Sequence, residues 1–205
     1  MLKLYAIPVS LYSAKTRIAL RFKGLDWKEI APPGGYGSAE YKRIVASGNL
    51  PALDHDGFLI ADSEAIAEYL EERFPEPPLL PKNAQDRTRM RERSRFHDTR
   101  LEPALRALFG NLAADRRDAD LNARQSIAMS ERLGQFARLL DAAPDLAFGL
   151  GDCGFAVTFA WIDALTQRLG LQIDWPDTVR SYQARLSDEA AVAAEFQTYL
   201  PRLQS

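Results

Sequence analysis

Three hydroxyl groups stand between the first apolar run of the chain and its first helical segment. Ser10, Tyr12 and Ser13 follow residues 2–6 and precede a segment of helical periodicity over 14–24. A helix N-terminus has unpaired N–H groups and partial positive charge, which favour an anion. A hydroxyl placed there can donate a hydrogen bond to a thiolate and lower the pKa of the thiol, which is ~8.5 when free. Ser10 is the first candidate for this role and Tyr12 and Ser13 are alternatives, although a serine there can equally be an ordinary cap.

Two further segments place polar or special residues at the ends of predicted elements. Pro51 follows Asn49 and Leu50 and opens a predicted strand, where proline is tolerated because no ladder donor is needed. Asp62 and Ser63 open a predicted helix. The N-terminus of that helix can bind a carboxylate, and Asp62 can form an ion pair with an ammonium group. Both segments also have purely structural interpretations, as a strand start and as a helix cap.

The elements that must position these residues alternate along the first half of the chain. Strands are predicted over residues 2–6, 26–30, 51–53 and 58–60. Helices are predicted over residues 14–24, 39–46 and 63–74. The last two strands surround an Asp-Gly pair, which is typical of a β-hairpin. The predicted order is therefore βαβαββα.

The second half of the chain is predicted to be all helical. It follows a proline-rich segment that is the best linker in the sequence. We therefore expect a first domain over 1–75, a linker over 76–84 and a helical domain over 85–205. Within the second half, one long helix is expected from Ala84 to Leu112 and a buried central helix from Phe155 to Leu169.

Composition excludes several classes of function. Lys and Arg total 26 and Asp and Glu total 28, so a net charge of -2 gives no global attraction to nucleic acid or to an anionic membrane. The single cysteine, Cys153, excludes an intramolecular disulfide and a multi-cysteine metal site, and no metal is expected. No apolar run reaches the ~18 residues of a membrane span, and the N-terminus turns polar too soon for a signal peptide. A cytoplasmic protein is expected.

The order of the three segments resembles the N-terminal domain of glutathione transferases, and the layout of the whole chain is similar to that family. The resemblance implies a thioredoxin-like N-terminal domain followed by an all-helical C-terminal domain. In the family, a residue at the start of the first helix contacts the glutathione sulfur, the residue before a cis-proline pairs with the cysteinyl backbone, and an acid-Ser pair holds the γ-glutamyl end. The resemblance thus implies catalysis by Ser10 and binding by Asn49, Leu50, Pro51, Asp62 and Ser63.

The resemblance also implies a reaction class. Ser10 matches the catalytic serine of the zeta, phi and tau classes, and glutathione would be the cosubstrate. Its thiolate would attack a small apolar electrophile by conjugation, dehalogenation or isomerisation, a detoxification chemistry carried out by a homodimer. Tyr12 stands where the zeta motif Ser-Ser-Cys-Ser has its cysteine, which argues against maleylacetoacetate isomerase activity.

Two other functions compete with this one. The same fold serves as a non-catalytic interaction module in stringent-starvation and translation-factor proteins, but the retained Ser10 and Asp62-Ser63 argue against it. A glutathione-dependent redox protein is the other. The missing cysteine at the first helix disfavours a mixed disulfide with the protein, but not exchange between two glutathione molecules.

The predicted buried helix departs from the family pattern at its start. The family has a Ser/Thr-x-x-Asp capping box there, and this chain has Phe155 and Thr158 at those two positions. The side-chain cap is therefore expected to be missing, with Gly154 in its place. His97 lies on the apolar stripe of the long helix and is predicted to be a packed residue rather than a ligand.

Overall fold

The computed structural model describes residues 1–204, and its contacts divide the chain into two compact units. The first unit comprises Met1–Leu79 together with Ala190–Leu203, and the second comprises Leu80–Glu189. The division after Leu79 falls within the expected linker over 76–84. Residues 190–203 differ from expectation, because we expected them in the helical domain and they group with the first unit.

A four-stranded sheet forms the centre of the first unit. Its strands are β1 (Leu2–Tyr5), β2 (Trp27–Ile30), β3 (Ala52–His55) and β4 (Phe58–Ala61). The spatial order is β2-β1-β3-β4, with β1 and β2 parallel and the other two pairs antiparallel. The β3–β4 hairpin turns at Asp56 and Gly57, whose φ angles of 52° and 92° are the positive values that a two-residue hairpin turn requires.

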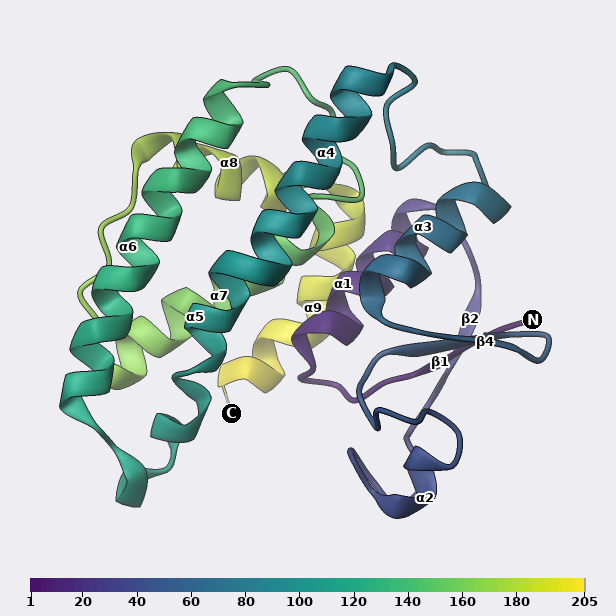
Figure 1. Ribbon diagram of the computed structural model, residues 1–205, viewed down its shortest axis with the longest axis horizontal. Coiled ribbons are helices and arrows are strands. Elements are labelled where there is room, and N and C mark those ends of the chain that lie inside the picture. Colours follow the sequence, from purple (N-terminus) through teal and green to yellow (C-terminus); the bar gives the residue numbers. More distant parts are fainter. Residues whose placement is uncertain (205) are drawn as a thin grey trace. The chain divides into compact units, whose positions relative to one another are not determined.

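Helices cover both faces of this sheet. They are α1 (Leu11–Phe22), α2 (Ala39–Lys42) and α3 (Ser63–Arg73) (Figure 1). Because side chains alternate along a strand, Leu4 and Leu53 pack in one core with Leu20 of α1 and Ile66 of α3. A second core forms around Tyr41, which lies on α2. The βαβαββα order and the thioredoxin-like domain are confirmed.

The second unit is built from helices, as predicted. They are α4 (Ala84–Phe96), α5 (Glu102–Arg106), α6 (Ala119–Asp141), α7 (Cys153–Leu169) and α8 (Asp177–Asp188). Short 3-10 turns cover Phe109–Leu112 and Ala114–Arg116. The last helix, α9 (Ala190–Gln204), begins after Glu189, and its residues through Leu203 belong to the first unit.

The expected single helix from Ala84 to Leu112 is wrong in two respects. A π-helical turn over His97–Leu101 separates α4 from α5, and α5 ends at Arg106. Pro103 lies at the start of α5 and has no N–H, so it cannot donate to the carbonyl four residues earlier. The N–H of Glu102 bonds to the carbonyl of His97, five residues back, which is the π-helical pattern.

At the start of α7, the residues that stand in place of the family's capping box have another role. No side chain caps this helix. Instead, Thr158 Oγ1 lies 2.7 Å from His97 Nε2, and Asp98 Oδ1 lies 2.7 Å from His97 Nδ1. His97 is buried against Gly154, where an added Cβ would come within 2.6 Å of the imidazole Cε1. His97 is thus a packed residue, and its ring occupies the space that a side chain at position 154 would fill.

This packing predicts the effect of one methyl group. Gly154→Ala should lower the free energy of unfolding by about 1–3 kcal/mol, because the hydrogen-bonded imidazole cannot move aside. Gly134→Ala on α6 is the matched control. Apart from its chain neighbours and the backbone of its own helix, no heavy atom of residues 1–204 lies within 4 Å of its added Cβ, and the change should raise stability by up to ~1 kcal/mol. Urea unfolding of both variants measures the contrast, and equal stabilities would contradict this account of the His97 contact.

Candidate functional site

The three polar segments leave the sheet at one edge. In the strand register, Tyr5 is paired with Ala52, and Ala52 is paired with Ala61. Tyr5 ends β1, Ala52 begins β3 and Ala61 ends β4, so these residues form a row across three neighbouring strands. The strands are about 4.8 Å apart. The segments that carry Ser10 and Asp62 therefore start from this row, and the segment that carries Pro51 ends at it.

Ser10 is the N-cap of α1 and is half-buried. Its Oγ accepts a hydrogen bond of 3.2 Å from the backbone N–H of Ser13. A serine hydroxyl has one hydrogen to donate and two lone pairs, and this cap uses one lone pair. The Ser10 hydroxyl hydrogen therefore stays available for an anion at the positive end of α1.

The two alternative hydroxyl groups lie differently. Ser13 is fully buried, and its Oγ has no hydrogen-bond partner among residues 1–204. Tyr12 is half-buried, and its ring centroid lies 5.9 Å from Lys15 Nζ. Since Ser13 presents no surface to a ligand, Ser10 is the better-placed of the two serines.

The loop before β3 presents free backbone groups next to Pro51. The Leu50–Pro51 peptide bond is cis, as the family resemblance implies. No hydrogen bond to the backbone of Leu50 is formed within the described part of the chain. An extended peptide lying alongside can pair with such groups in the manner of an added strand.

Two tyrosines that the sequence did not single out hold this loop. Tyr41 donates a 3.1 Å hydrogen bond to the carbonyl of Asn49, and Tyr36 donates one of 3.3 Å to its Oδ1. Burial, with a smaller effect of Tyr5, raises the pKa of Tyr41 to about 12. Tyr41 therefore remains a donor at neutral pH and fixes the residue that precedes Leu50.

Asp62 and Ser63 begin α3, but the helix start is already capped. Asp62 Oδ1 accepts from the N–H groups of Glu64 and Ala65 at 2.9 and 3.0 Å. The φ of Asp62 is 91°, a value that non-glycine residues rarely adopt. The cap uses two first-turn N–H groups, so the N–H and hydroxyl of Ser63 are the donors left for a ligand carboxylate.

A partly buried ion pair lies at the start of α3, and the sequence alone does not predict it. Lys15 Nζ on α1 lies 2.8 Å from Glu64 Oε2 on α3, and the side-chain exposures are 2% and 14%. It joins the two helices whose N-termini form the site, and its positive charge lies beside the acidic start of α3. Helical periodicity places Lys15 on α1 but gives no sign of this partner 49 residues away.

Comparison with known proteins gives matches in both sequence and fold. Residues 4–78 match the family model described as the glutathione S-transferase N-terminal domain. Glutathione S-transferase Z1 of Arabidopsis thaliana is 42% identical over 89 residues, which are 42% of this chain and 40% of that protein. Maleylacetoacetate isomerase of Pseudomonas aeruginosa is 41% identical over 96 residues, 44% of this chain and 45% of that protein.

The match to these curated relatives spans somewhat less than half of their length. Likeness of structure extends further. A bacterial maleyl pyruvate isomerase of the zeta class aligns with a TM-score of 0.78 at 24% identity, over 94% of this chain and 95% of that one. The chain therefore has the glutathione transferase fold over nearly its whole length.

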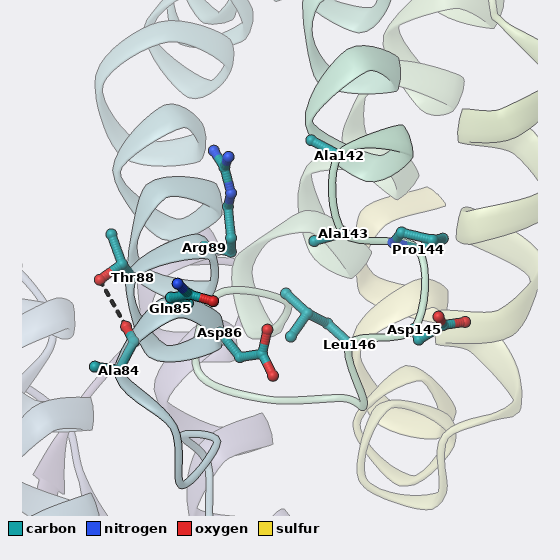
Figure 2. Close-up of a pocket in the computed structure, with 10 residues that line it drawn as sticks. All are labelled: Ala84, Gln85, Asp86, Thr88, Arg89, Ala142, Ala143, Pro144, Asp145 and Leu146. Carbon is teal, nitrogen blue, oxygen red and sulfur yellow. Dashed lines mark hydrogen bonds between the residues drawn. The ribbon is translucent and has the colours of Figure 1, made fainter.

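The cavity shown in Figure 2 is lined by a different set of residues from the candidate site. It has a volume of about 960 Å³ and is formed within the second unit by the start of α4 and residues 142–146. Asp86 and Leu146 lie between the helix and the loop, and Thr88 donates to the carbonyl of Ala84. None of the residues predicted to bind glutathione lines it.

Among residues 1–204, no group of three or more His, Cys, Asp and Glu side chains is arranged to hold a metal ion. Within the same residues, no helix is both long and apolar enough to cross a membrane.

The cap at Asp62 predicts a contrast between two variants of this protein. Asp62→Ala should lower the free energy of unfolding by about 1–2 kcal/mol, because two first-turn N–H groups lose their acceptor. Asp62→Asn keeps an acceptor of similar capping strength and should stay within about 0.5 kcal/mol of wild type. Denaturant unfolding measures both. An Asp62→Ala variant as stable as wild type would contradict the capping role.

Proposed function

We propose that this chain is a glutathione transferase that binds glutathione at the sheet edge of its N-terminal domain and activates the thiolate with Ser10. The observation that carries the proposal is the convergence of three segments, each suited to a different part of one tripeptide. Ser10 suits the sulfur, the free backbone of Leu50 suits the cysteinyl peptide, and Ser63 with Asp62 suits the γ-glutamyl end.

Each of these groups would bind a different part of glutathione. The backbone of Leu50, set by cis Pro51 and by the tyrosine-held Asn49, would pair with the cysteinyl residue. Ser63 would donate its N–H and hydroxyl to the γ-glutamyl carboxylate. Asp62 caps α3 through Oδ1 alone, so Oδ2 would meet the ligand ammonium.

Activation would follow from the position of Ser10. A thiol is a poor nucleophile while protonated, and its pKa of ~8.5 leaves little thiolate at neutral pH. The start of α1 offers partial positive charge, and the Ser10 hydroxyl offers a hydrogen bond to the charged form. Both favour the thiolate. Ser10 would act as a donor and not as a base.

The electrophile and the reaction subtype are part of the proposal. In conjugation or dehalogenation the sulfur would bond to a carbon of a small apolar electrophile, with loss of a leaving group where there is one. In isomerisation the thiolate would add and leave again. The relatives are named both as transferases and as isomerases, which supports keeping isomerisation within the proposal despite Tyr12 at the zeta cysteine position.

A homodimer is also proposed. The outer strand β4 carries Phe58 and Leu59, which are 59% and 37% exposed. Apolar side chains on an edge strand favour contact with another chain. A cytoplasmic location remains a prediction.

Glutathione binding tests the proposal at α3. Titration of the wild-type protein with reduced glutathione by calorimetry should show binding, and Ser63→Ala should weaken it roughly tenfold through loss of a hydrogen bond to a charged group. Ser187→Ala is the control, because its exposed hydroxyl donates to the carbonyl of Gln183 within α8. No binding by the wild type at millimolar glutathione would reject the transferase and favour the non-catalytic interaction module.

Thiolate formation tests the proposal at α1. The ultraviolet absorbance of bound glutathione, followed against pH, should give a thiol pKa below the free value of ~8.5. A depressed pKa means that thiolate is present above it and lost as the pH falls through it. Ser10→Ala should move this pKa upward by about 1, since roughly 1–1.5 kcal/mol of hydrogen bonding to the charged form is lost. An unchanged pKa would remove Ser10 from the mechanism.

A further inference from the structure

The two residues before Ser10 are exposed, yet their carbonyl groups are held by side chains. Pro8 and Val9 lie on the surface, and Val9 is 41% exposed. The carbonyl of Pro8 accepts a 3.1 Å hydrogen bond from Arg17 Nη2. The carbonyl of Val9 accepts one of 3.0 Å from the hydroxyl of Tyr199. The side chains of Pro8 and Val9 are exposed, so packing does not anchor them. The two side-chain hydrogen bonds, together with one of 3.2 Å from the N–H of Ser10 to the carbonyl of Ile7, fix the path of the backbone into Ser10.

Both of these donors depend on α9. Tyr199 lies on α9 and is 1% exposed. Arg17 lies on α1, and its Nε is 2.7 Å from Oε1 of Glu195, an α9 residue that is also 1% exposed. The other oxygen of Glu195 lies 3.3 Å from Arg21 Nε. The helix at the end of the chain thus reaches the loop before Ser10 directly and through Arg17.

The ion pair between Arg17 and Glu195 is better explained by its effect on the direction of the Arg17 side chain than by a contribution to stability. Desolvation of a buried pair offsets most of its attraction, so such pairs contribute little net stability. Arg17 also makes a contact of 3.4 Å between Nη1 and Glu29. All three guanidinium nitrogens are therefore engaged, and the direction of Nη2 toward Pro8 is fixed. A small cavity of about 260 Å³ is lined by Arg17 and Glu195 together with Pro8 and Tyr199.

We propose that α9 is a positioning element for Ser10, with Tyr199 as the residue that sets the direction of the Ser10 hydroxyl. The inference rests on the proposed function, in which that hydroxyl donates to the glutathione thiolate. Tyr199 holds the carbonyl of the residue bonded to Ser10, so it constrains the peptide plane from which the Ser10 N-cap begins. A hydrogen bond to the thiolate requires this orientation, whereas binding of the γ-glutamyl end at α3 does not.

The proposal predicts a selective effect of one hydroxyl group. Tyr199→Phe should raise the pKa of the bound glutathione thiol by roughly 0.5 to 1, because a misdirected Ser10 donates a weaker hydrogen bond. The Kd for glutathione, measured where the thiol is protonated, should change by less than about twofold. Glu195→Gln, which loosens the contact with Arg17, should raise the pKa in the same direction.

Two controls separate positioning from a general loss of structure. Tyr69→Phe removes a tyrosine hydroxyl of the same unit, one that lies 2.6 Å from His55 Nδ1. Thr198→Ala removes the hydroxyl next to Tyr199, which bonds only within α9 to the carbonyl of Glu195 at 3.2 Å. Neither should change the pKa of the bound thiol.

The decisive experiment is a double-mutant cycle of Tyr199→Phe and Ser10→Ala, read out by the pKa of the bound glutathione thiol. If Tyr199 acts through Ser10, the double variant has the pKa of Ser10→Ala alone. Additive effects, or no effect of Tyr199→Phe where Ser10→Ala is effective, would overturn the positioning role and leave the proposed function intact. No effect of Ser10→Ala itself would overturn both, since there would be no serine to position.

Discussion

The hydrogen-bonded register of β1, β3 and β4 is the constraint on which the candidate site depends. Tyr5, Ala52 and Ala61 are brought into one row by the antiparallel pairings, and the segments that carry chemistry begin or end there. A slip of one residue would turn Leu4 and Leu53 from the buried face to the opposite one. The same apolar alternation that builds the core therefore fixes where the polar segments meet.

At both helix starts, one residue serves the fold and remains available for a ligand. Ser10 caps α1 with a lone pair and keeps its hydrogen. Asp62 caps α3 with a single oxygen and leaves the N–H and hydroxyl of Ser63 for a carboxylate. A cap and a ligand contact are thus compatible when they use different atoms of the same group. This is why a sequence pattern typical of caps does not argue against a binding role.

Local patterns were sufficient for most of the fold. Apolar runs and turn residues predicted βαβαββα, and Asp56-Gly57 predicted the hairpin, because both depend on neighbouring residues. The interruption of the long helix was not predicted, because the apolar stripe continues past Pro103. The one sign of the π-helical turn in the sequence is that Pro103 has no N–H. The grouping of α9 with the first unit was not predicted, because its contacts with α1 span 178 residues of sequence.

The candidate site divides in the same way. Ser10, Leu50, Pro51 and Asp62-Ser63 stand at element ends, which sequence can locate. The residues that hold these site residues in place do not stand at element ends. Tyr41 and Lys15 act through partners on other elements, at Asn49 and at Glu64. Nothing in the spacing of a tyrosine or a lysine along its own helix specifies such a partner, so these supports emerge only from tertiary structure.

A crystal structure of the protein with reduced glutathione tests the central claim most directly. The account predicts the sulfur at a hydrogen-bonding distance of roughly 3.0–3.5 Å from Ser10 Oγ, the cysteinyl backbone paired with Leu50, and the γ-glutamyl carboxylate on Ser63. A sulfur bound to Tyr12 or Ser13 instead, or a ligand found away from the sheet edge, would contradict it.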